Sequence, residues 1–240
     1  MNKRVKKFLI ALIPIKSIRH KLRKKPVIPL KVEDIGKNNL IQVPPSSPVI
    51  VRVHGNNNVI KIDSKAYING VIEVYGDSNN IIIGKGPYTL SLFIGVPDCN
   101  ASGCQFTLGK EGLINGAVIR LCEDKSSVQI GDNCLFSDQI NIWASDTHTL
   151  LDAKGNILNW GHKVVIGNHV WLGCQVTVLK DTVIPDDCVV GWGSIVTKKF
   201  DEVGCVLAGN PARVVKKGIS WDEKRPNQYQ RMKNENNTKG

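Results

Sequence analysis

Aliphatic residues recur at every sixth position over much of the C-terminal half of the chain. Counted from residue 166, one frame holds six anchors in succession: Ile166, Leu172, Val178, Ile184, Val190 and Val196. A glycine or proline directly follows several of these anchors. A period of six fits neither the 3.6-residue repeat of an α-helix nor the alternation of a long strand. It is typical of very short strands joined by turns, with one aliphatic side chain of each turn directed inward.

Strands of this kind predict an all-β fold, a parallel β-helix. Three short strands make one triangular coil, and each coil covers the apolar interior of the next. Residues of modest size stand four places after the anchors, where a second inward position lies at the corner: Val170, Val176, Thr182, Cys188 and Ser194. The low aromatic content, 6%, agrees with a core of stacked aliphatic side chains.

The repeat weakens towards the N-terminus. The same frame includes Ile130, Phe136 and Ile142, with Cys134 in the small position. Over residues 49–127 the period is blurred, but alternating apolar runs remain and segments rich in Asn and Gly separate them. Because Asn and Gly tolerate the left-handed backbone of tight corners, we expect irregular early coils of the same helix.

The two ends of the chain differ from the repeat region. Residues 32–48 include three prolines and predict an extended linker. Residues 218–240 are polar and predict a loose tail that could contain a short helix. The chain is therefore expected to comprise a basic arm with its linker (1–48), a β-helix domain (49–217) and the C-terminal tail.

One segment departs from the six-residue frame. Between residues 142 and 166 the positions that should hold anchors include His148 and Trp160, which do not suit an aliphatic column. Residues 146–163 therefore predict a loop that projects from the coil. Long loops on a rigid scaffold commonly carry function, so candidate chemistry is sought here first.

The net charge of +11 is confined to one end of the chain. Residues 1–31 hold eleven of the 32 Lys and Arg residues and no acid, which leaves 21 basic against 21 acidic residues elsewhere. A nucleic-acid binder is disfavoured because the body has no basic excess. The short apolar run at 8–15 contains a proline and lacks a cleavage site, so it predicts neither a signal peptide nor a membrane span. An interfacial membrane contact, a solvated tail and a helix packed on its own oligomer stay open.

Seven cysteines form no CxxC pair and are odd in number, which argues against a disulfide framework or a structural zinc site. We expect a reducing, cytoplasmic location in which Cys serves as a small apolar residue. The arm makes the inner face of the cytoplasmic membrane a candidate peripheral contact.

Four stretches carry a resemblance to a known family. They are IGDNCLFSDQINIWASDTHTLLD, the Asn159 that precedes the returning coil, IGNHVWLG, and AGNPARVVK at 208–216. In this order they resemble the hexapeptide-repeat acyltransferases, specifically the bacterial surface-polysaccharide O-acetyltransferases. The resemblance is close over about 125–217 and looser over 49–124. It implies a left-handed coil, a homotrimer with sites at subunit boundaries, acetyl-CoA as co-substrate and a glycan hydroxyl as acceptor.

The resemblance assigns the general base to His148, because that family places its base after a Ser-Asp pair in the loop. A sugar hydroxyl attacks a thioester only slowly unless its proton is removed, and an imidazole suits this task near neutral pH. Asp146 could orient or charge-stabilise the ring, or it could cap its own backbone as a loop-entry residue. Trp171 is expected to point outward beside the loop and to line the acceptor or thioester site, as in similar enzymes. Trp143 and Trp160 are weaker candidates for stacking on a sugar.

Similar enzymes lay coenzyme A along the turns between two subunits. The matching turn positions here are Gly173, Cys174, Gly191, Trp192 and Gly193. The positions near the phosphates in relatives match Thr197, Lys198, Arg213, Lys216 and Lys217. Trp192 departs from the small residue that is usual in the family. Carbonic anhydrases of the same repeat hold zinc with three histidines, but the spacing of His148, His162 and His169 does not match theirs, so no metal is expected.

Two alternatives remain at this stage. The same acetyl transfer could act on a nucleotide-linked amino sugar or a small xenobiotic. The chain could also be a non-catalytic β-helix that scaffolds a glycan assembly complex through its basic arm. Release of free thiol from acetyl-CoA with a given acceptor separates these possibilities.

Overall fold

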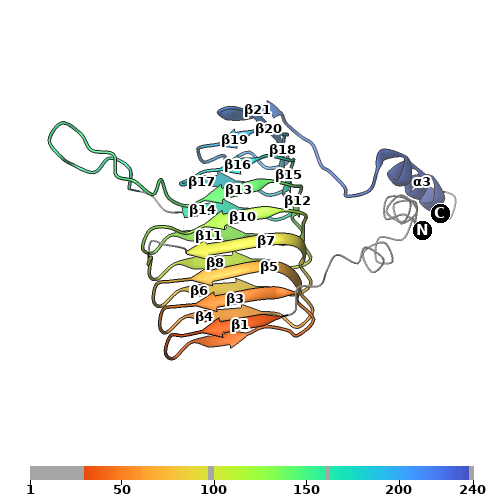
Figure 1. Ribbon diagram of the computed structural model, residues 1–240. Helices are drawn as coiled ribbons and strands as arrows, with labels where there is room; N and C mark the ends of the chain where they lie inside the picture. Colours follow the sequence, from red (N-terminus) through yellow and green to blue (C-terminus); the bar gives the residue numbers. More distant parts are fainter. Residues whose placement is uncertain (1–29, 97–99, 161–162, 238–240) are drawn as a thin grey trace, which may run out of the picture.

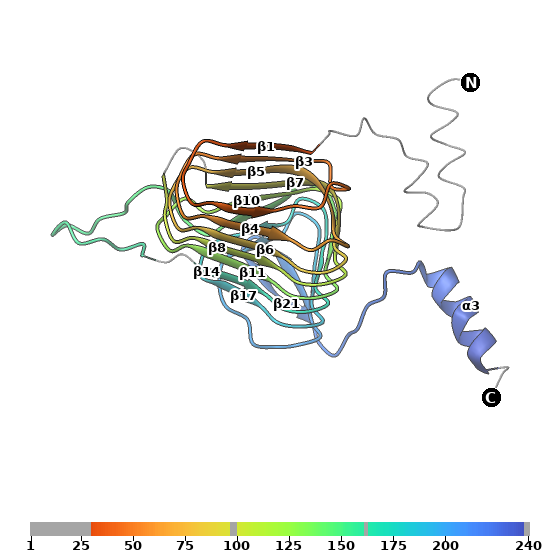
Figure 2. The same ribbon diagram turned by 90° about the horizontal axis from the view of Figure 1, so that it is seen from below.

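In the computed structural model the chain forms a parallel β-solenoid, described over residues 30–96, 100–160 and 163–237. Short strands stack in register along three faces, and a long loop and a C-terminal helix project from opposite sides of the stack (Figures 1 and 2). The prediction of a parallel β-helix is confirmed. In the described part of the chain, no helix is both long and apolar enough to cross a membrane. The basic arm lies outside the described residues up to residue 29.

The strands of each face follow one another at intervals of about one coil. The first face comprises β1 (Lys31–Asp34), β3 (Val49–Val53), β5 (Tyr67–Val74), β7 (Tyr88–Val96), β10 (Ala117–Arg120), β13 (Ile140–Trp143), β16 (Thr177–Val178) and β19 (Ile195–Val196). The second comprises β2 (Leu40–Gln42), β4 (Val59–Ile62), β6 (Asn80–Ile83), β8 (Gln105–Leu108), β11 (Ser127–Ile130), β14 (Lys163–Ile166) and β17 (Thr182–Ile184). The third comprises β9 (Leu113–Ile114), β12 (Leu135–Phe136), β15 (Trp171–Leu172), β18 (Val189–Val190) and β20 (Val206–Gly209). The chain ends with β21 (Ala212–Lys216), antiparallel to β20, and α3 (Pro226–Asn237).

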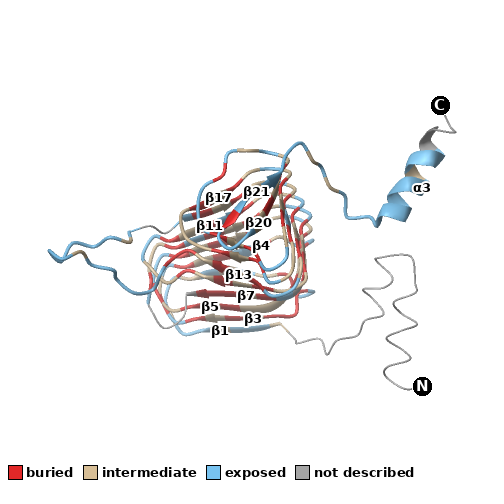
Figure 3. Cartoon of the chain, turned by 90° about the horizontal axis from the view of Figure 1, so that it is seen from above, coloured by how far each residue is buried: buried red, intermediate tan, exposed pale blue. Residues whose placement is uncertain are grey.

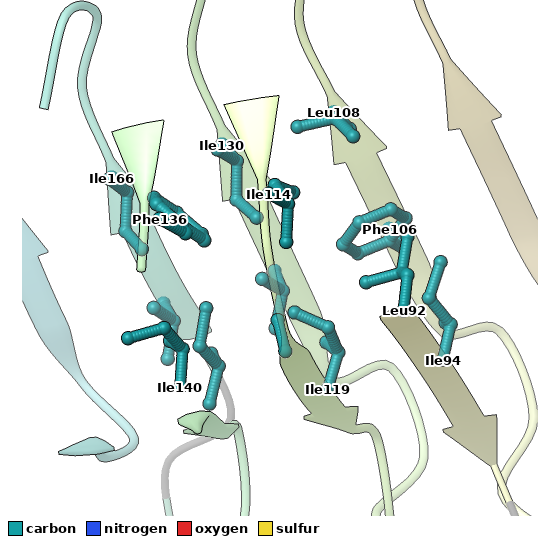
Figure 4. Packing of buried hydrophobic residues seen from close by; sticks show 14 of the residues in the cluster. Leu92, Ile94, Phe106, Leu108, Ile114, Ile119, Ile130, Phe136, Ile140 and Ile166 are labelled. Atoms are coloured by element: carbon teal, nitrogen blue, oxygen red, sulfur yellow. The ribbon is translucent and has the colours of Figure 1, made fainter. Parts of the chain in front are cut away.

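The six-residue anchors form the core as predicted. Ile130, Ile166 and Ile184 pair in sequence on the second face, and each is at most 2% exposed. Phe136 and Leu172 occupy the same position on the third face and are fully buried. Figure 4 shows Ile130, Phe136 and Ile166 among the buried side chains that pack together inside the stack. Each buried aliphatic side chain contributes about 1.5–3 kcal/mol through removal from water, so the repeat itself stabilises the stack.

The Asn-rich segments form corners, and their side chains link successive coils. The amide of Asn58 donates to Asn39 Oδ1, that of Asn79 to Asn58 Oδ1, and that of Cys104 to Asn79 Oδ1, each at 2.8 Å. Asn57, at the adjacent turn position, has a φ of 56°. The irregular early coils are therefore held by a buried asparagine ladder that satisfies backbone donors at the corner.

The solenoid starts earlier than the proline content indicates. Residues 32–48, expected as a linker, contain most of β1 and all of β2, which pair with β3 and β4. The prolines lie in the corner between β2 and β3, outside both strands. They therefore interrupt no hydrogen bond between strands. The prediction of a linker over this segment is wrong because corner prolines resemble linker prolines in a sequence.

The predicted loop projects from the corner between β13 and β14 (Figure 1). Its two arms meet at an antiparallel bridge between Leu151 and Ile157, and its surface is exposed (Figure 3). Ile142 pairs with Val178, whereas Val178 pairs with Val196 half that distance along the chain. The loop therefore adds as many residues as one whole coil contains, which explains why the six-residue frame continues after it.

Candidate active site

The base of the loop is held by the side chain of Asn159. Its Nδ2 donates to the carbonyl of His148 at 2.8 Å and to Asp146 Oδ2 at 2.9 Å. Its Oδ1 accepts the amide of Leu150 at 2.9 Å. One amide therefore joins the two arms of the loop on both sides of His148. Asn159 was noted only as part of a sequence match, and its structural role was not predicted.

Lys180, which lies on the next coil, contacts the same residues at the base of the loop. Its Nζ donates to the carbonyl of Asn159 at 3.1 Å and lies 3.5 Å from Asp146 Oδ2 and 3.4 Å from Asp181 Oδ2. The Lys180 side chain is only 15% exposed, so these contacts are partly shielded from water. The loop is thus fixed to the solenoid at its entrance and at its exit.

The entrance is also fixed by Ser145. Its hydroxyl donates to Glu123 Oε1 at 2.7 Å and accepts the amide of Thr147 at 2.8 Å. Thr147 has a φ of 63°, a left-handed conformation that costs a non-glycine residue about 1–2 kcal/mol. His148, which follows this turn, is exposed.

Asp146 stands two residues before His148, and the contact between the two residues is made by their backbone atoms. The amide of His148 donates to the carbonyl of Asp146 at 2.7 Å, while the carboxylate contacts Asn159 and Lys180. The imidazole of His148 is exposed. It neither donates a hydrogen bond to a described residue nor accepts one from it. Asp146 therefore orders the loop around the histidine.

Trp171 lies on β15 with 37% of its surface exposed, and a residue of the tail packs beside it. The ring of Trp221 is 6.0 Å from that of Trp171 and stacks on His169 at 4.2 Å. Its Nε1 donates to the carbonyl of His169 at 2.7 Å, and His169 Nδ1 lies 2.7 Å from Asp187 Oδ1. Trp221 was not predicted as a site residue. A single tryptophan in a polar tail was the signal that could have found it.

The other two tryptophans differ in their environments. Trp143 ends β13 at the entrance of the loop, with Arg120 over its ring. Trp160 is 71% exposed at the exit of the loop and packs on no other ring in the described residues.

The turns predicted for coenzyme A stack at the corner between the third and first faces. Gly173 and Cys174 follow β15, and the segment 191–193 follows β18 one coil later. The amide of Gly193 donates to the carbonyl of Cys174 at 2.9 Å. The exposed Trp192 donates through Nε1 to Gln175 Oε1 at 2.9 Å, which fixes the indole along this corner.

The predicted phosphate-end cations lie near the top of the stack. Thr197 and Lys198 follow β19, and Lys198 Nζ lies 5.1 Å from the ring of Phe200. Arg213, Lys216 and Lys217 are exposed on or after β21. The Glu202 carboxylate hydrogen bonds to Lys217 and raises the pKa of its ammonium group, so this cation already has a counter-ion.

A single chain does not bring all of these residues together. The loop with His148 leaves the corner between the first and second faces, whereas Trp171 lies on the third face (Figure 1). The turns at 173–174 and 191–193 lie at the corner between the third and first faces. Within one chain, the loop with His148 and the strand with Trp171 therefore lie on different parts of the stack.

Buried thiols and metal clusters contribute little to this site. Burial raises the pKa of the Cys134 thiol to about 11, and that of Cys205 to about 12. Over the described ranges no group of three His, Cys, Asp or Glu side chains is arranged to hold a metal ion. His162, considered above as a ligand, lies outside those ranges.

Known proteins resemble the chain over most of its length. It is 32% identical over 194 residues to the polysialic acid O-acetyltransferase of Neisseria meningitidis, covering 79% of this chain and 88% of that protein. It is 31% identical over 120 residues to the polysialic acid O-acetyltransferase of Escherichia coli O1:K1, but spans only 38% of that protein. The crystal structure of the polySia-specific acetyltransferase NeuO superposes with a TM-score of 0.74 at 27% identity, covering 88% of this chain and 99% of that one. No family model matches the sequence.

The chain is a hexapeptide-repeat acetyltransferase, which confirms the resemblance found in its sequence. Within that class it belongs to the family of the polysialic acid O-acetyltransferases.

Proposed function

We propose that this enzyme transfers an acetyl group from acetyl-CoA to a hydroxyl of a bacterial surface polysaccharide, with a sialic acid polymer as acceptor. The single observation that carries the proposal is the pair of hydrogen bonds donated by the Asn159 side chain, which hold His148 at the base of a projecting loop. The relatives named above supply the acceptor class, because both act on polysialic acid according to their names.

In the proposed reaction His148 is the general base. Its ring is exposed and free of internal hydrogen bonds in the described chain, so it can accept the proton of an incoming hydroxyl. The deprotonated oxygen attacks the thioester carbon, the carbon–sulfur bond breaks, and the proton passes to the departing thiolate. General-base catalysis of this kind contributes typically about 10²–10⁴-fold. Asp146 acts as a positioning residue through Asn159 and Lys180.

The proposed active unit is a homotrimer of left-handed coils with sites between subunits. Outward side chains of the first face form an apolar row of Ile50, Val71, Phe93 and Val118. The long strands β5 and β7 begin on the third face and continue onto the first, so the outward side chains of the third face form a second row of Tyr67, Tyr88, Leu113, Leu135 and Trp171. The outward row of the second face is mixed, with Lys61, Thr107 and Gln129 beside Ile82, Val165 and Val183. Two apolar rows on adjacent faces support packing against two neighbours, since apolar rows on a monomer are otherwise exposed to water.

Acetyl-CoA is proposed to lie along the stacked turns at 173–174 and 191–193. Residues 173, 174 and 191 are half-buried, whereas Gly193 is exposed and a Cβ added to it would meet no atom within 4 Å, so a ligand can approach the backbone closely at Gly193. Lys198, Arg213 and Lys216 are the candidate partners for its phosphates. Trp192 is proposed to line this corner because Gln175 fixes its indole.

The test is acetylation of a sialic acid oligomer by the wild type and by His148→Ala. We expect free thiol to appear only when both acetyl-CoA and the oligomer are present with the wild type. The substitution should leave the fold intact and lower kcat by at least about a hundredfold. His54→Ala is the matched control, because His54 stacks on Tyr75 in the early coils, remote from the loop. Near-normal turnover by His148→Ala would remove the general-base role.

A further inference from the structure

Arg120 lies at the foot of the catalytic loop. It is the last residue of β10, and it pairs with Trp143, the last residue of β13. Its carbonyl accepts the amide of Ala144 at 3.1 Å, four residues before His148. Both strands end at the edge of the stack from which the loop leaves (Figure 1).

The guanidinium of Arg120 lies between two aromatic rings. Its Cζ is 4.9 Å from the ring centre of Phe93 and 5.7 Å from that of Trp143. Contacts of this type stabilise the cation through the ring faces and fix the plane of the fork. They leave the in-plane N–H groups of the guanidinium without a carboxylate, and its Nε has no hydrogen-bond partner although it is buried. A buried donor left unpaired is unfavourable, so packing alone does not explain this arrangement.

A second arginine, Arg52, lies in the same row of paired residues along the first face, and its charge is neutralised by carboxylates. Arg52 hydrogen bonds to Glu33 and Glu73, which stand on the adjacent strands. The next residue in the row is Gly95, which pairs with Glu73 on one side and with Arg120 on the other. A glycine therefore stands where the alternation would place a side chain beside Arg120.

The nearest acids on the chain have other partners. Glu73 is engaged by Arg52, and Glu123, which follows β10, accepts the Ser145 hydroxyl. Across the part of the chain that the structure describes, no carboxylate lies within 4.0 Å of the Arg120 guanidinium. The body of the protein is formally neutral, so an unpaired cation beside the loop is a specific feature rather than part of a basic surface.

We propose that Arg120, held between Phe93 and Trp143, binds the carboxylate of an acidic sugar in the acceptor. This inference rests on the proposed function, and it names the group that recognises the acceptor's charge. A carboxylate can accept two parallel hydrogen bonds from a guanidinium fork, which fixes its orientation as well as its position. Because the fork is anchored at the loop entrance, the carboxylate would orient a neighbouring hydroxyl relative to His148.

The experiment compares two acceptors with wild type, Arg120→Gln and Arg120→Lys. One acceptor is a sialic acid oligomer, and the other is the same oligomer with its carboxyl groups reduced to alcohols. We expect Arg120→Gln to raise the KM for the native oligomer about tenfold or more without changing the KM for acetyl-CoA. Arg120→Lys keeps the charge but lacks the fork, so it should recover only part of this affinity. The reduced oligomer should bind wild type and Arg120→Gln equally, since the interaction is then already absent.

Arg52→Gln is the matched control, because it removes a guanidinium from the same row that already has its counter-ions. An unchanged KM for Arg120→Gln, an equal loss in Arg52→Gln, or an equal loss on the reduced oligomer would overturn the inference. A changed oligomeric state of Arg120→Gln by light scattering would also overturn it, since Arg120 would then serve a subunit contact. Calorimetry separates the two proposals: binding that depends on Arg120 without turnover would support the subsite and reject the acetyl transfer to this acceptor.

Discussion

Replacing Lys180 by Met should loosen the loop that carries His148 without unfolding the solenoid. The substitution keeps most of the apolar stem but removes the ammonium group that joins Asn159, Asp146 and Asp181. The Lys180 side chain is 15% exposed and that of Asp146 is 39% exposed, so water screens part of the interaction. A hydrogen bond to a charged group is worth about 1.5–3 kcal/mol, and the exposure of Asp146 favours the lower end of that range.

A loss of about 1.5 kcal/mol at the loop base lowers the ratio of ordered to open loop roughly tenfold, so the ordered population falls several-fold when the two states are close in free energy. We therefore expect kcat for Lys180→Met to fall several-fold. The KM for acetyl-CoA should change little, because the donor is proposed to lie along other corners. The melting temperature should stay within a few degrees of the wild type, because the coils themselves are untouched.

The assay is steady-state release of free thiol, with thermal unfolding followed in parallel. Lys154→Met is the matched control, since Lys154 lies at the exposed tip of the same loop and its ammonium group makes no ion pair with a described residue. Lys180→Arg keeps the charge and should retain more activity than Lys180→Met. Turnover within twofold of wild type for Lys180→Met, or an equal loss for Lys154→Met, would refute this account of the loop.

Three further outcomes are expected. Trp221→Ala should slow turnover several-fold with little change in solenoid melting, because it removes the stacking and hydrogen bond that hold His169 beside Trp171; kinetics with Trp221→Phe, which keeps a ring, should give an intermediate value. Phe136→Ala should destabilise the fold by about 3–5 kcal/mol in urea unfolding, since the ring is fully buried. Stability should decrease by about 2–3 kcal/mol between pH 9 and pH 11, because the folded state retains the Cys134 proton that the unfolded chain releases. Cys134→Ala should remove that part of the alkaline slope, and an unchanged slope would show that the thiol titrates alike in both states.

The repeat region could be predicted because each anchor obeys one local rule. Ile166 and Ile184 are directed inward by the same turn geometry, so periodicity alone identifies them. The loop was equally visible, since His148 and Trp160 cannot fill an aliphatic column. The early coils were less regular in the sequence because their lengths differ: Ile94, Ile119 and Ile142 pair in succession at unequal spacings. There, the asparagine ladder replaces strict periodicity as the determinant of register.

The contacts that build the candidate site were beyond a sequence pattern. Trp221 reaches His169 across 52 positions, and nothing local indicates where a polar tail will run. The environment of Arg120 depends on which residue of the neighbouring coil stands beside it, and this register follows from coil lengths that vary. Corner prolines near residues 44–48 misled for a related reason, because their role depends on strands that lie before and after them.

The central claim is that His148 of one protomer acts beside Trp171 of its neighbour, and mixed oligomers test it most directly. His148→Ala and Trp171→Ala proteins should each be nearly inactive alone. When the two are unfolded together and refolded as a mixture, roughly one site in four would combine an intact His148 with an intact Trp171 from the next protomer. The account predicts that activity returns to about a quarter of the wild-type value. Mixtures that stay as inactive as the separate variants would contradict a site shared between subunits.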